Sequence, residues 1–320
     1  VLRGRKLINI DSEEEGVLIA GCAGGGRICV NMKIARQDCK YNHVLIKMSG
    51  LLGGHSGSDI NLGRASSYTL LVRLITKIYE KMDIRLVSIE TGKLINVISN
   101  SGVVELAVAD GDECIGIVEA VSKELKSEYE KTDKDISITV EKANGDILPL
   151  TEDDTVKVTT ILTSMPQGVK RMMEDVEGAV ETSINWGRCD LLNDELVMWG
   201  LVRSHVDDRA YELLNRVSWI AKGNGALTEI DSTYPAWQYE EKSELRDKMS
   251  EIYRDMFGHD LKIEVMHAGL ECGFLVDKIK GVDAVSIGPN IPDIHTPNER
   301  MEIASVERTW KYLLKVLEEV

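Results

Sequence analysis

The feature that most constrains the fold of this chain is a short apolar run that ends in a break of the backbone. Residues 282–287 (VDAVSI) predict a buried strand, and the glycine, prolines and asparagine of residues 288–292 predict a loop after it. The loop presents Asp293, His295 and Glu299. In open α/β sheets, ligands bind beyond the carboxyl ends of strands, and a loop histidine can ligate a metal while a carboxylate orients its ring. The segment therefore favours an α/β fold and makes His295 a candidate metal ligand, although loop histidines are more often ordinary surface residues.

The two ends of the chain share this α/β character. Strands are expected at residues 7–10 and from residue 17, and the C-terminal part alternates between strands and helices. The expected C-terminal elements are helix 241–257, strand 261–265, helix 274–279 and helix 303–320. Residues 1–21 and 234–320 therefore predict two parts of one α/β domain, which residues 22–233 interrupt.

The interrupting region predicts an α+β domain made of two similar halves. Strand, helix, strand, strand, helix, strand is the split βαβ order of a ferredoxin-like unit. The first half is expected at 43–51, 61–82 (with Ser58 or Asp59 as N-cap), 85–89, 103–107, 114–129 and 136–141, with a further strand near 94–98. The second is expected at 153–163, 180–185, 196–202, 207–221 and 227–230. Glycines 24–26 do not open a helix as a nucleotide site would, and predict a hinge or hairpin.

Composition excludes several classes of protein. The net charge is −15 and no cluster of Lys and Arg stands out, which argues against a nucleic-acid groove. No apolar run approaches the ~20 residues that span a bilayer, and no signal segment opens the sequence, so we expect no membrane partner and a cytoplasmic location. The six cysteines form no C-x-x-C pair and are expected to be reduced thiols.

Three further residues are candidates for a functional site, each with an ordinary structural alternative. Asp11 ends the first strand before an acidic loop, and it is either a metal ligand or part of a solvated acidic turn. His55 lies in a glycine-flanked loop before a helix N-terminus, where an anion or substrate carboxylate is favoured, or is incidental to the turn. Arg203 ends a strand and suits bidentate binding of a carboxylate, or a surface salt bridge. The residue types alone leave these alternatives open.

Several separate stretches together match one family. These are LINIDSEEEG around Asp11, GCAGG at 21–25, GGHSGSDINLGRA around His55, LINVIS with Asn96, MPQGV at 165–169, LVRS with Arg203, HAGLECG at 267–273 and IGPNIPDIHTPNERMEI around His295. The chain resembles the aminoacyl-histidine dipeptidases, the Xaa-His dipeptidases of the PepD type, within the di-zinc metallopeptidase family that includes carnosinase. The resemblance covers nearly the whole sequence.

The resemblance implies a zinc peptidase in which an inserted lid of two ferredoxin-like halves interrupts a catalytic α/β domain. A metal-activated water would hydrolyse the peptide bond of short Xaa-His dipeptides, with two zinc ions per complete site and other divalent metals also compatible. Asp11 would ligate one zinc ion and His295 the other. His55 would reach from the lid to the scissile carbonyl or its oxyanion. The residues implied to hold the substrate, chiefly its terminal carboxylate, are Asn96, Arg203 and Gly269, with Glu271 and Asp293 in supporting roles.

The resemblance also implies that ligands are missing. The family's His-x-Asp motif, its bridging aspartate and its Glu-Glu pair lie upstream of the NIDSEEEG match, and this sequence begins at Val1, shortly before that match. We therefore expect an incomplete fragment that binds zinc weakly and is inactive alone. Two alternatives remain: a broader dipeptidase, tripeptidase or aminoacylase, and a non-catalytic lid fragment that associates, for example as a homodimer through exposed sheet edge and apolar surface.

Overall fold

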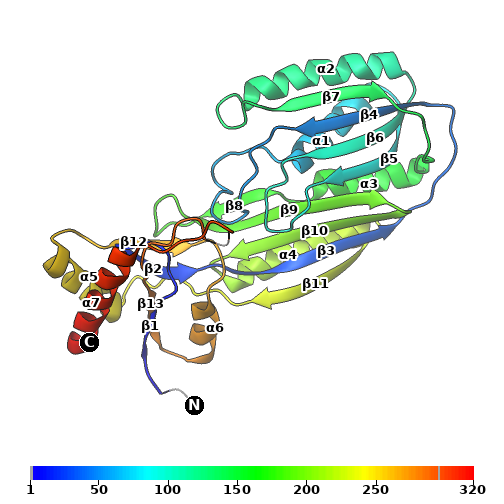
Figure 1. Cartoon of the computed structure of the whole chain (residues 1–320). Helices are drawn as coiled ribbons and strands as arrows, with labels where there is room; N and C mark the ends of the chain where they lie inside the picture. The colour runs from blue at the N-terminus through cyan, green and yellow to red at the C-terminus, as the bar shows by residue number, and fades with distance from the viewer. Residues whose placement is uncertain (1–2, 295) are drawn as a thin grey trace.

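The structure is a computed structural model that describes residues 3–294 and 296–320. Its strands form two sheets (Figure 1). The smaller sheet has the order β1-β13-β2-β12, and its strands are β1 (Lys6–Asn9), β13 (Asp283–Ser286), β2 (Val17–Cys22) and β12 (Lys262–Met266). β1 pairs with β13 in parallel and β12 pairs with β2 in parallel. The first strand of the chain therefore lies beside the last.

Both faces of the smaller sheet are covered. Successive side chains of β2 point to opposite faces, and β2 is buried throughout. Leu18 belongs to the apolar cluster with α5 (Glu244–Phe257) and α7 (Ile303–Glu319), whereas Ile19 belongs to the cluster with α6 (Glu271–Lys278). This arrangement confirms the predicted α/β fold of the two chain ends.

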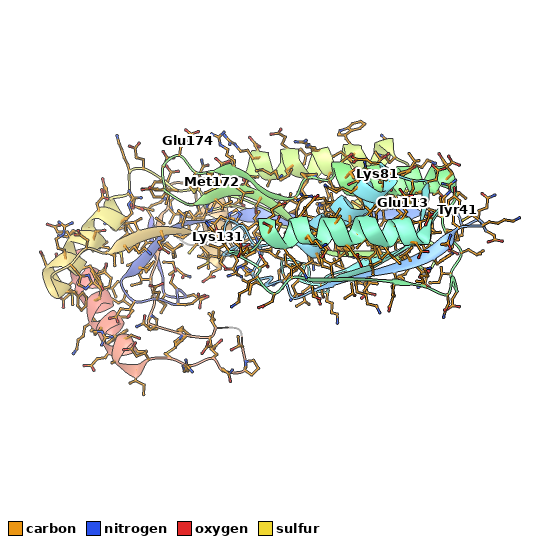
Figure 2. The ribbon with its side chains drawn as sticks, turned by 90° about the horizontal axis from the view of Figure 1, so that it is seen from above. Tyr41, Lys81, Glu113, Lys131, Met172 and Glu174 are labelled. Carbon is orange, nitrogen blue, oxygen red and sulfur yellow. The ribbon has the colours of Figure 1, made fainter. Side chains whose placement is uncertain are left out.

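The larger sheet is antiparallel and has the order β11-β3-β10-β9-β5-β6-β4-β7, with β8 paired to β9. Its strands are β3 (Gly24–Lys33), β4 (Asn42–Ser49), β5 (Ile84–Thr91), β6 (Gly102–Val108), β7 (Ser137–Lys142), β8 (Gly168–Met172), β9 (Val180–Leu192), β10 (Glu195–Ser204) and β11 (Leu227–Tyr234). Its helices are α1 (Ser67–Tyr79), α2 (Gly111–Glu128), α3 (Glu152–Ser164) and α4 (Asp207–Gly223). Seen from above (Figure 2), this part extends away from the smaller sheet, with Tyr41 near its far end.

The two ferredoxin-like halves are confirmed. One half has the strand order β7-β4-β6-β5 and the other has β11-β3-β10-β9, which is the same order by position in each half. The second half takes its first strand, β3, from before the first half, which explains why its element order looked less regular in the sequence. β5 and β9 join the halves into one sheet.

Three local predictions were wrong. Residues 94–98 form no strand, and only Val97 makes a bridge, with His55. The helix predicted from residue 61 begins at Ser67, because Asp59 accepts a hydrogen bond from the backbone of His55 and helps to fold the preceding loop instead of capping a helix. Gly24–Gly26 are not a hairpin turn, because they open β3.

The change between sheets falls close to the predicted domain boundaries. The chain passes from the smaller to the larger sheet between β2 and β3, and it returns after β11. The division into domains at 1–21, 22–233 and 234–320 stays a prediction. Within residues 3–294 and 296–320, no helix is long and apolar enough to span a bilayer.

Candidate active site

Arg203 is a buried cation at the junction of the two sheets. It lies near the end of β10 and is 5% exposed. Its Nη1 donates to the hydroxyl of Tyr234 at 3.4 Å, its Nη2 lies 3.4 Å from Nε2 of His55, and its Nε is buried with no hydrogen-bond partner in the described chain. Burial lowers the pKa of Arg203, because desolvation disfavours its charge. A buried charge without a counter-charge costs several kcal/mol, so this position favours an anionic ligand.

The His55 ring is oriented by its own loop. Its Nδ1 lies 3.3 Å from the backbone nitrogens of Gly57 and Ser58, which can only donate. The neutral tautomer that accepts from these two backbone groups carries its proton on Nε2, where the Arg203 guanidinium is also a donor. Nε2 of His55 and the Arg203 guanidinium therefore face each other across 3.4 Å.

Two more histidines lie behind this pair. Nε2 of His267 is 2.8 Å from the hydroxyl of Ser183, and the His267 ring stacks on His205 at 5.7 Å between centroids. Burial lowers the pKa of His267 to about 3, and His205, Arg203 and His55 lower it further, whereas a contact with the backbone of Val180 acts in the opposite direction. Burial lowers the pKa of His205 to about 4. Both rings are therefore neutral at pH 7.

Loops from distant parts of the chain meet near the contacts of Arg203. A Cβ at Gly57 would lie 2.3 Å from the carbonyl oxygen of His267, so the two loops approach within backbone contact. Gly269 packs on Tyr234, where an added Cβ would lie 2.8 Å from the ring. Asn96 is exposed, and its carbonyl accepts from the backbone of Ser56 at 2.9 Å.

Four of the predicted residues, His55, Asn96, Arg203 and Gly269, are thus brought to one region. Sequence reasoning assigned no role to Tyr234, Ser183 or His205, and it did not place His267 among the expected site residues. Two signals were available: His205 follows Arg203 by two residues, and His267 opens the HAGLECG stretch.

Asp11 and Glu271 lie at the carboxyl end of β1 instead. The side chain of Asn9 joins them: its Oδ1 accepts from the backbone of Asp11 at 2.9 Å, and its Nδ2 donates to Glu271. Glu271, which was predicted to support substrate binding, contacts Asn9 and not Arg203. Asp293 forms an ion pair with Arg300 at 3.0 Å.

The predicted metal ligand His295 lies outside the described residues. Among the residues that the structure describes, no group of three His, Cys, Asp or Glu side chains could hold a metal ion. The described residues therefore supply Asp11 alone from the predicted ligand pair, and they do not make a metal centre by themselves.

Residues 6–319 match the model of the peptidase family M20/M25/M40. The chain belongs to this family. It is 32% identical over 318 residues to the cytosol non-specific dipeptidase of Escherichia coli (strain K12), a match that covers 98% of this chain and 66% of that protein.

A solved structure has the same fold. The aminoacylhistidine dipeptidase of Vibrio alginolyticus superposes with a TM-score of 0.94 at 32% identity, covering 100% of this chain and 66% of that one. These matches confirm the family resemblance and the fold. The chain spans about two thirds of the length of both relatives. The matches do not support the prediction that the chain is catalytically incomplete, and it stays a prediction.

Proposed function

We propose that this M20/M25/M40 family protein is a zinc-dependent, cytoplasmic dipeptidase that hydrolyses the peptide bond of short Xaa-His dipeptides. The observation that carries the proposal is the buried guanidinium of Arg203, which lies beside His55 and has no ion pair within the described residues. A dipeptide supplies the missing counter-charge, since its terminal carboxylate is one residue from the scissile bond. An Arg anchor at that distance also favours short substrates over long peptides.

His55 supports the same proposal. With its proton on Nε2, the ring offers a donor beside Arg203, where a carbonyl oxygen next to an anchored carboxylate would lie. A donor aimed at an oxygen that gains charge stabilises the transition state of acyl transfer. We therefore propose that His55 contacts the scissile carbonyl, while Arg203, with Asn96 and Gly269 at the rim, holds the carboxylate.

Zinc is part of the proposal, with Asp11 and His295 as ligands. Asp11 is exposed at the end of a strand of the smaller sheet, and carboxylate oxygen is a normal zinc donor. When bound, zinc would supply a water of lowered pKa. The residues of this chain would bind and orient the peptide next to it.

The test is hydrolysis of Ala-His and β-Ala-His, with zinc added, by a longer version of the protein that carries the family's His-x-Asp and Glu-Glu motifs, beside the 320-residue chain, which is expected to be inactive alone. We expect the longer protein to release free histidine, to release none after chelation, and to leave longer peptides uncleaved. A longer protein that leaves both dipeptides intact at saturating zinc would overturn the proposal.

A broader dipeptidase is the nearest alternative, and the non-specific dipeptidase among the relatives favours it. A panel of dipeptides, tripeptides and N-acyl amino acids distinguishes the two. Similar kcat/KM values for Ala-His and Ala-Leu would replace the Xaa-His assignment with the broader one.

A role in association, as a homodimer, is the alternative from another class. Helix α7 carries Ile303, Trp310 and Leu317 at seven-residue spacing, and all three are exposed (86%, 57% and 64%). Residues seven apart lie on one side of a helix, and an apolar seam of this kind is what helix pairing buries. The specific expectation for this surface is a second copy of the chain.

A further inference from the structure

We infer that His267, with Ser183 fixing its tautomer and His205 its ring plane, is a second donor to the substrate carboxylate beside Arg203. The inference rests on the proposed function and names a binding residue and two positioning residues for it. Arg203 would bind one carboxylate oxygen and His267 Nδ1–H the other.

The first step is the set of buried nitrogens that have no partner. In the described chain these include Nε of Arg203, Nδ1 of His267 and both ring nitrogens of His205. A buried polar atom without a partner is costly, because it has lost its hydrogen bonds to water and gained none in the protein. Arg203 and His267, which both carry such an atom, point to a ligand with more than one acceptor atom.

The second step is the tautomer of His267. Its ring is neutral, so it carries one N–H and one acceptor nitrogen. Ser183 lies 2.8 Å from Nε2. When the serine hydroxyl donates to Nε2, the ring proton is on Nδ1, which makes no well-formed hydrogen bond in the described chain, and the ring also lies near the backbone of Val180. Ser183 is paired with Arg203 in the register of β9 and β10, so one pair of strands carries both the Arg anchor and the residue that sets the tautomer.

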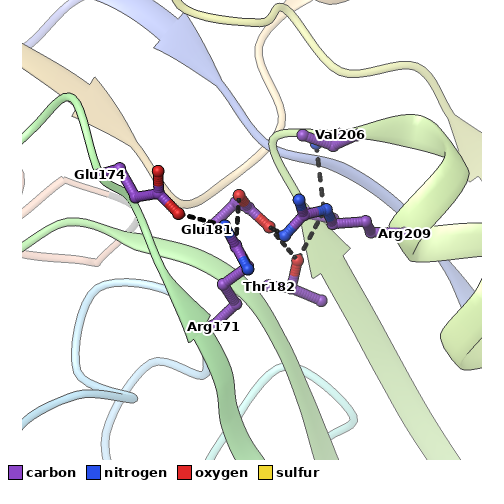
Figure 3. Close-up of polar contacts among 7 residues, drawn as sticks. Arg171, Glu174, Glu181, Thr182, Val206 and Arg209 are labelled. Carbon is purple, nitrogen blue, oxygen red and sulfur yellow. Dashed lines mark hydrogen bonds and ion pairs between the residues drawn. The ribbon is translucent and has the colours of Figure 1, made fainter.

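The third step is the rigidity of the segment that carries His205. The backbone nitrogen of His205 donates to the carbonyl of Glu181 at 2.9 Å, and the hydroxyls of Thr182 and Ser204 lie 2.9 Å apart. The Glu181 carboxylate, which is itself buried, pairs with Arg209 at 2.7 Å and Arg171 at 3.2 Å (Figure 3).

This network fixes the start of β9 to the end of β10 and to the start of α4. His205 is 1% exposed, so its ring is held as a plane against which His267 stacks. We assign to His205 the orientation of the His267 ring, not contact with the substrate.

The chemistry favours a carboxylate over the other parts of a dipeptide. The cluster combines a cation with imidazoles that are neutral at pH 7, and Arg203 has no ion pair within residues 3–294 and 296–320. A planar carboxylate presents two oxygens to two donors, as bidentate recognition requires. A substrate ammonium group would place a second positive charge next to the Arg203 guanidinium, and the repulsion between the two disfavours its binding there.

The experiment compares two variants of His267 whose side-chain amides lie near different nitrogens of the original ring. His267→Asn retains a donor near the position of Nδ1, whereas His267→Gln retains a contact near Nε2 with Ser183 and loses the Nδ1 donor. Calorimetry measures the binding of free histidine and of histidinamide to each protein, and the ratio of the two affinities reports carboxylate recognition. KM and kcat for Ala-His and its amide are measured in parallel.

We expect His267→Gln to lower the acid-to-amide ratio by about tenfold, because a hydrogen bond to a charged group is lost, and to raise KM more than it lowers kcat. His267→Asn should keep the ratio within about threefold, since one donor is retained. Ser183→Ala should lower the ratio by several-fold without removing any group that touches the ligand. His205→Phe, which keeps a flat ring, should retain the ratio, and His205→Ala should reduce it.

An unchanged ratio in His267→Gln would overturn the inference, and so would equal losses in His267→Asn and His267→Gln, which would mean that the ring only packs. Equal binding of acid and amide by the unmodified protein would also overturn it. If the unmodified protein prefers the acid and His267→Gln loses that preference while no dipeptide is hydrolysed, the inference stands and the proposed function fails.

Discussion

Nη2 of Arg203 lies 3.4 Å from Nε2 of His55, although the two residues are 148 positions apart in the chain. Two nitrogens that both carry protons gain little from this contact alone. The arrangement gains when a substrate places its carboxylate against Arg203 and its carbonyl oxygen against His55, because the buried charge then has a counter-charge. The predictions below follow from this relationship and from the groups around it.

Replacement of Arg203 should remove the carboxylate anchor. We expect Arg203→Gln to lower kcat/KM for Ala-His by about 100-fold, and Arg203→Lys to recover only part of the loss because an ammonium group lacks the planar fork. Steady-state kinetics check this. Arg188→Gln, on the neighbouring strand β9, is the matched control and should keep full activity, because Arg188 pairs with Asp190 and lies half exposed. Equal effects of the two glutamine variants would contradict the role given to Arg203.

Replacement of His55 should act on the chemical step. We expect His55→Phe to lower kcat by roughly 100-fold while KM changes little, because the lost donor acts on charge that develops in the transition state. Binding of free histidine, measured by calorimetry, should be nearly unchanged. A variant with unchanged kcat and a raised KM would instead place His55 at the carboxylate.

The free energy of unfolding should decrease as pH falls through the range between the unfolded and folded pKa values of His205. The pKa of His205 is lowered from 6.5 to about 4 by burial, so the unfolded chain binds a proton between these values and the folded chain does not. Its stabilising contribution is therefore complete above pH 6.5 and is lost as pH falls toward 4, at ~1.4 kcal/mol per pH unit at most.

His205→Phe removes that titration. Urea denaturation at pH 7 and pH 4.5 should give a free-energy difference between the two pH values that is about 2 kcal/mol smaller for the variant. Identical pH dependence of the two proteins would show that His205 is not buried as a neutral ring.

Metal removal tests the Asp11 end of the site. We expect a chelator to abolish hydrolysis and added zinc to restore it, because the proposed reaction needs a water of lowered pKa. Asp11→Asn should bind less zinc, measured by metal analysis after gel filtration, while its binding of free histidine stays unchanged. Glu14→Gln, in the acidic loop that follows Asp11, is the control and should bind zinc normally. Full zinc binding by Asp11→Asn would remove Asp11 from the proposed ligands.

The exposed stripe of α7 makes a separate prediction. If Ile303, Trp310 and Leu317 form a contact between two copies, sedimentation velocity should show a concentration-dependent dimer, and Trp310→Glu should shift it to monomer. Lys311→Glu, the neighbouring exposed position that pairs with Glu307, should leave the dimer intact. A monomer at every concentration would reject association through this surface.

The sequence was most informative where a signal is local. The strand that ends before the His295 loop, the ferredoxin-like element order and the polar residues at strand ends all depend on neighbours in the chain, and the structure confirms those elements of the fold. Local signals failed at residues 94–98 and at the start of α1. There, contacts with the His55 loop decide the conformation, and those contacts join residues that are far apart in sequence.

The sequence by itself determined the family, the α/β and α+β parts, and the identity of His55 and Arg203 as candidates. Only the tertiary structure decided that Arg203 is buried without an ion pair in the described chain, and that His205, His267 and Ser183 lie beside it. The physical reason is that burial and hydrogen-bond satisfaction are properties of a packed interior. Strands β9 and β10 belong to the larger sheet, whereas the loop of His267 follows β12 of the smaller sheet. The contact between them joins residues far apart in the chain, so it could not be predicted from sequence spacing.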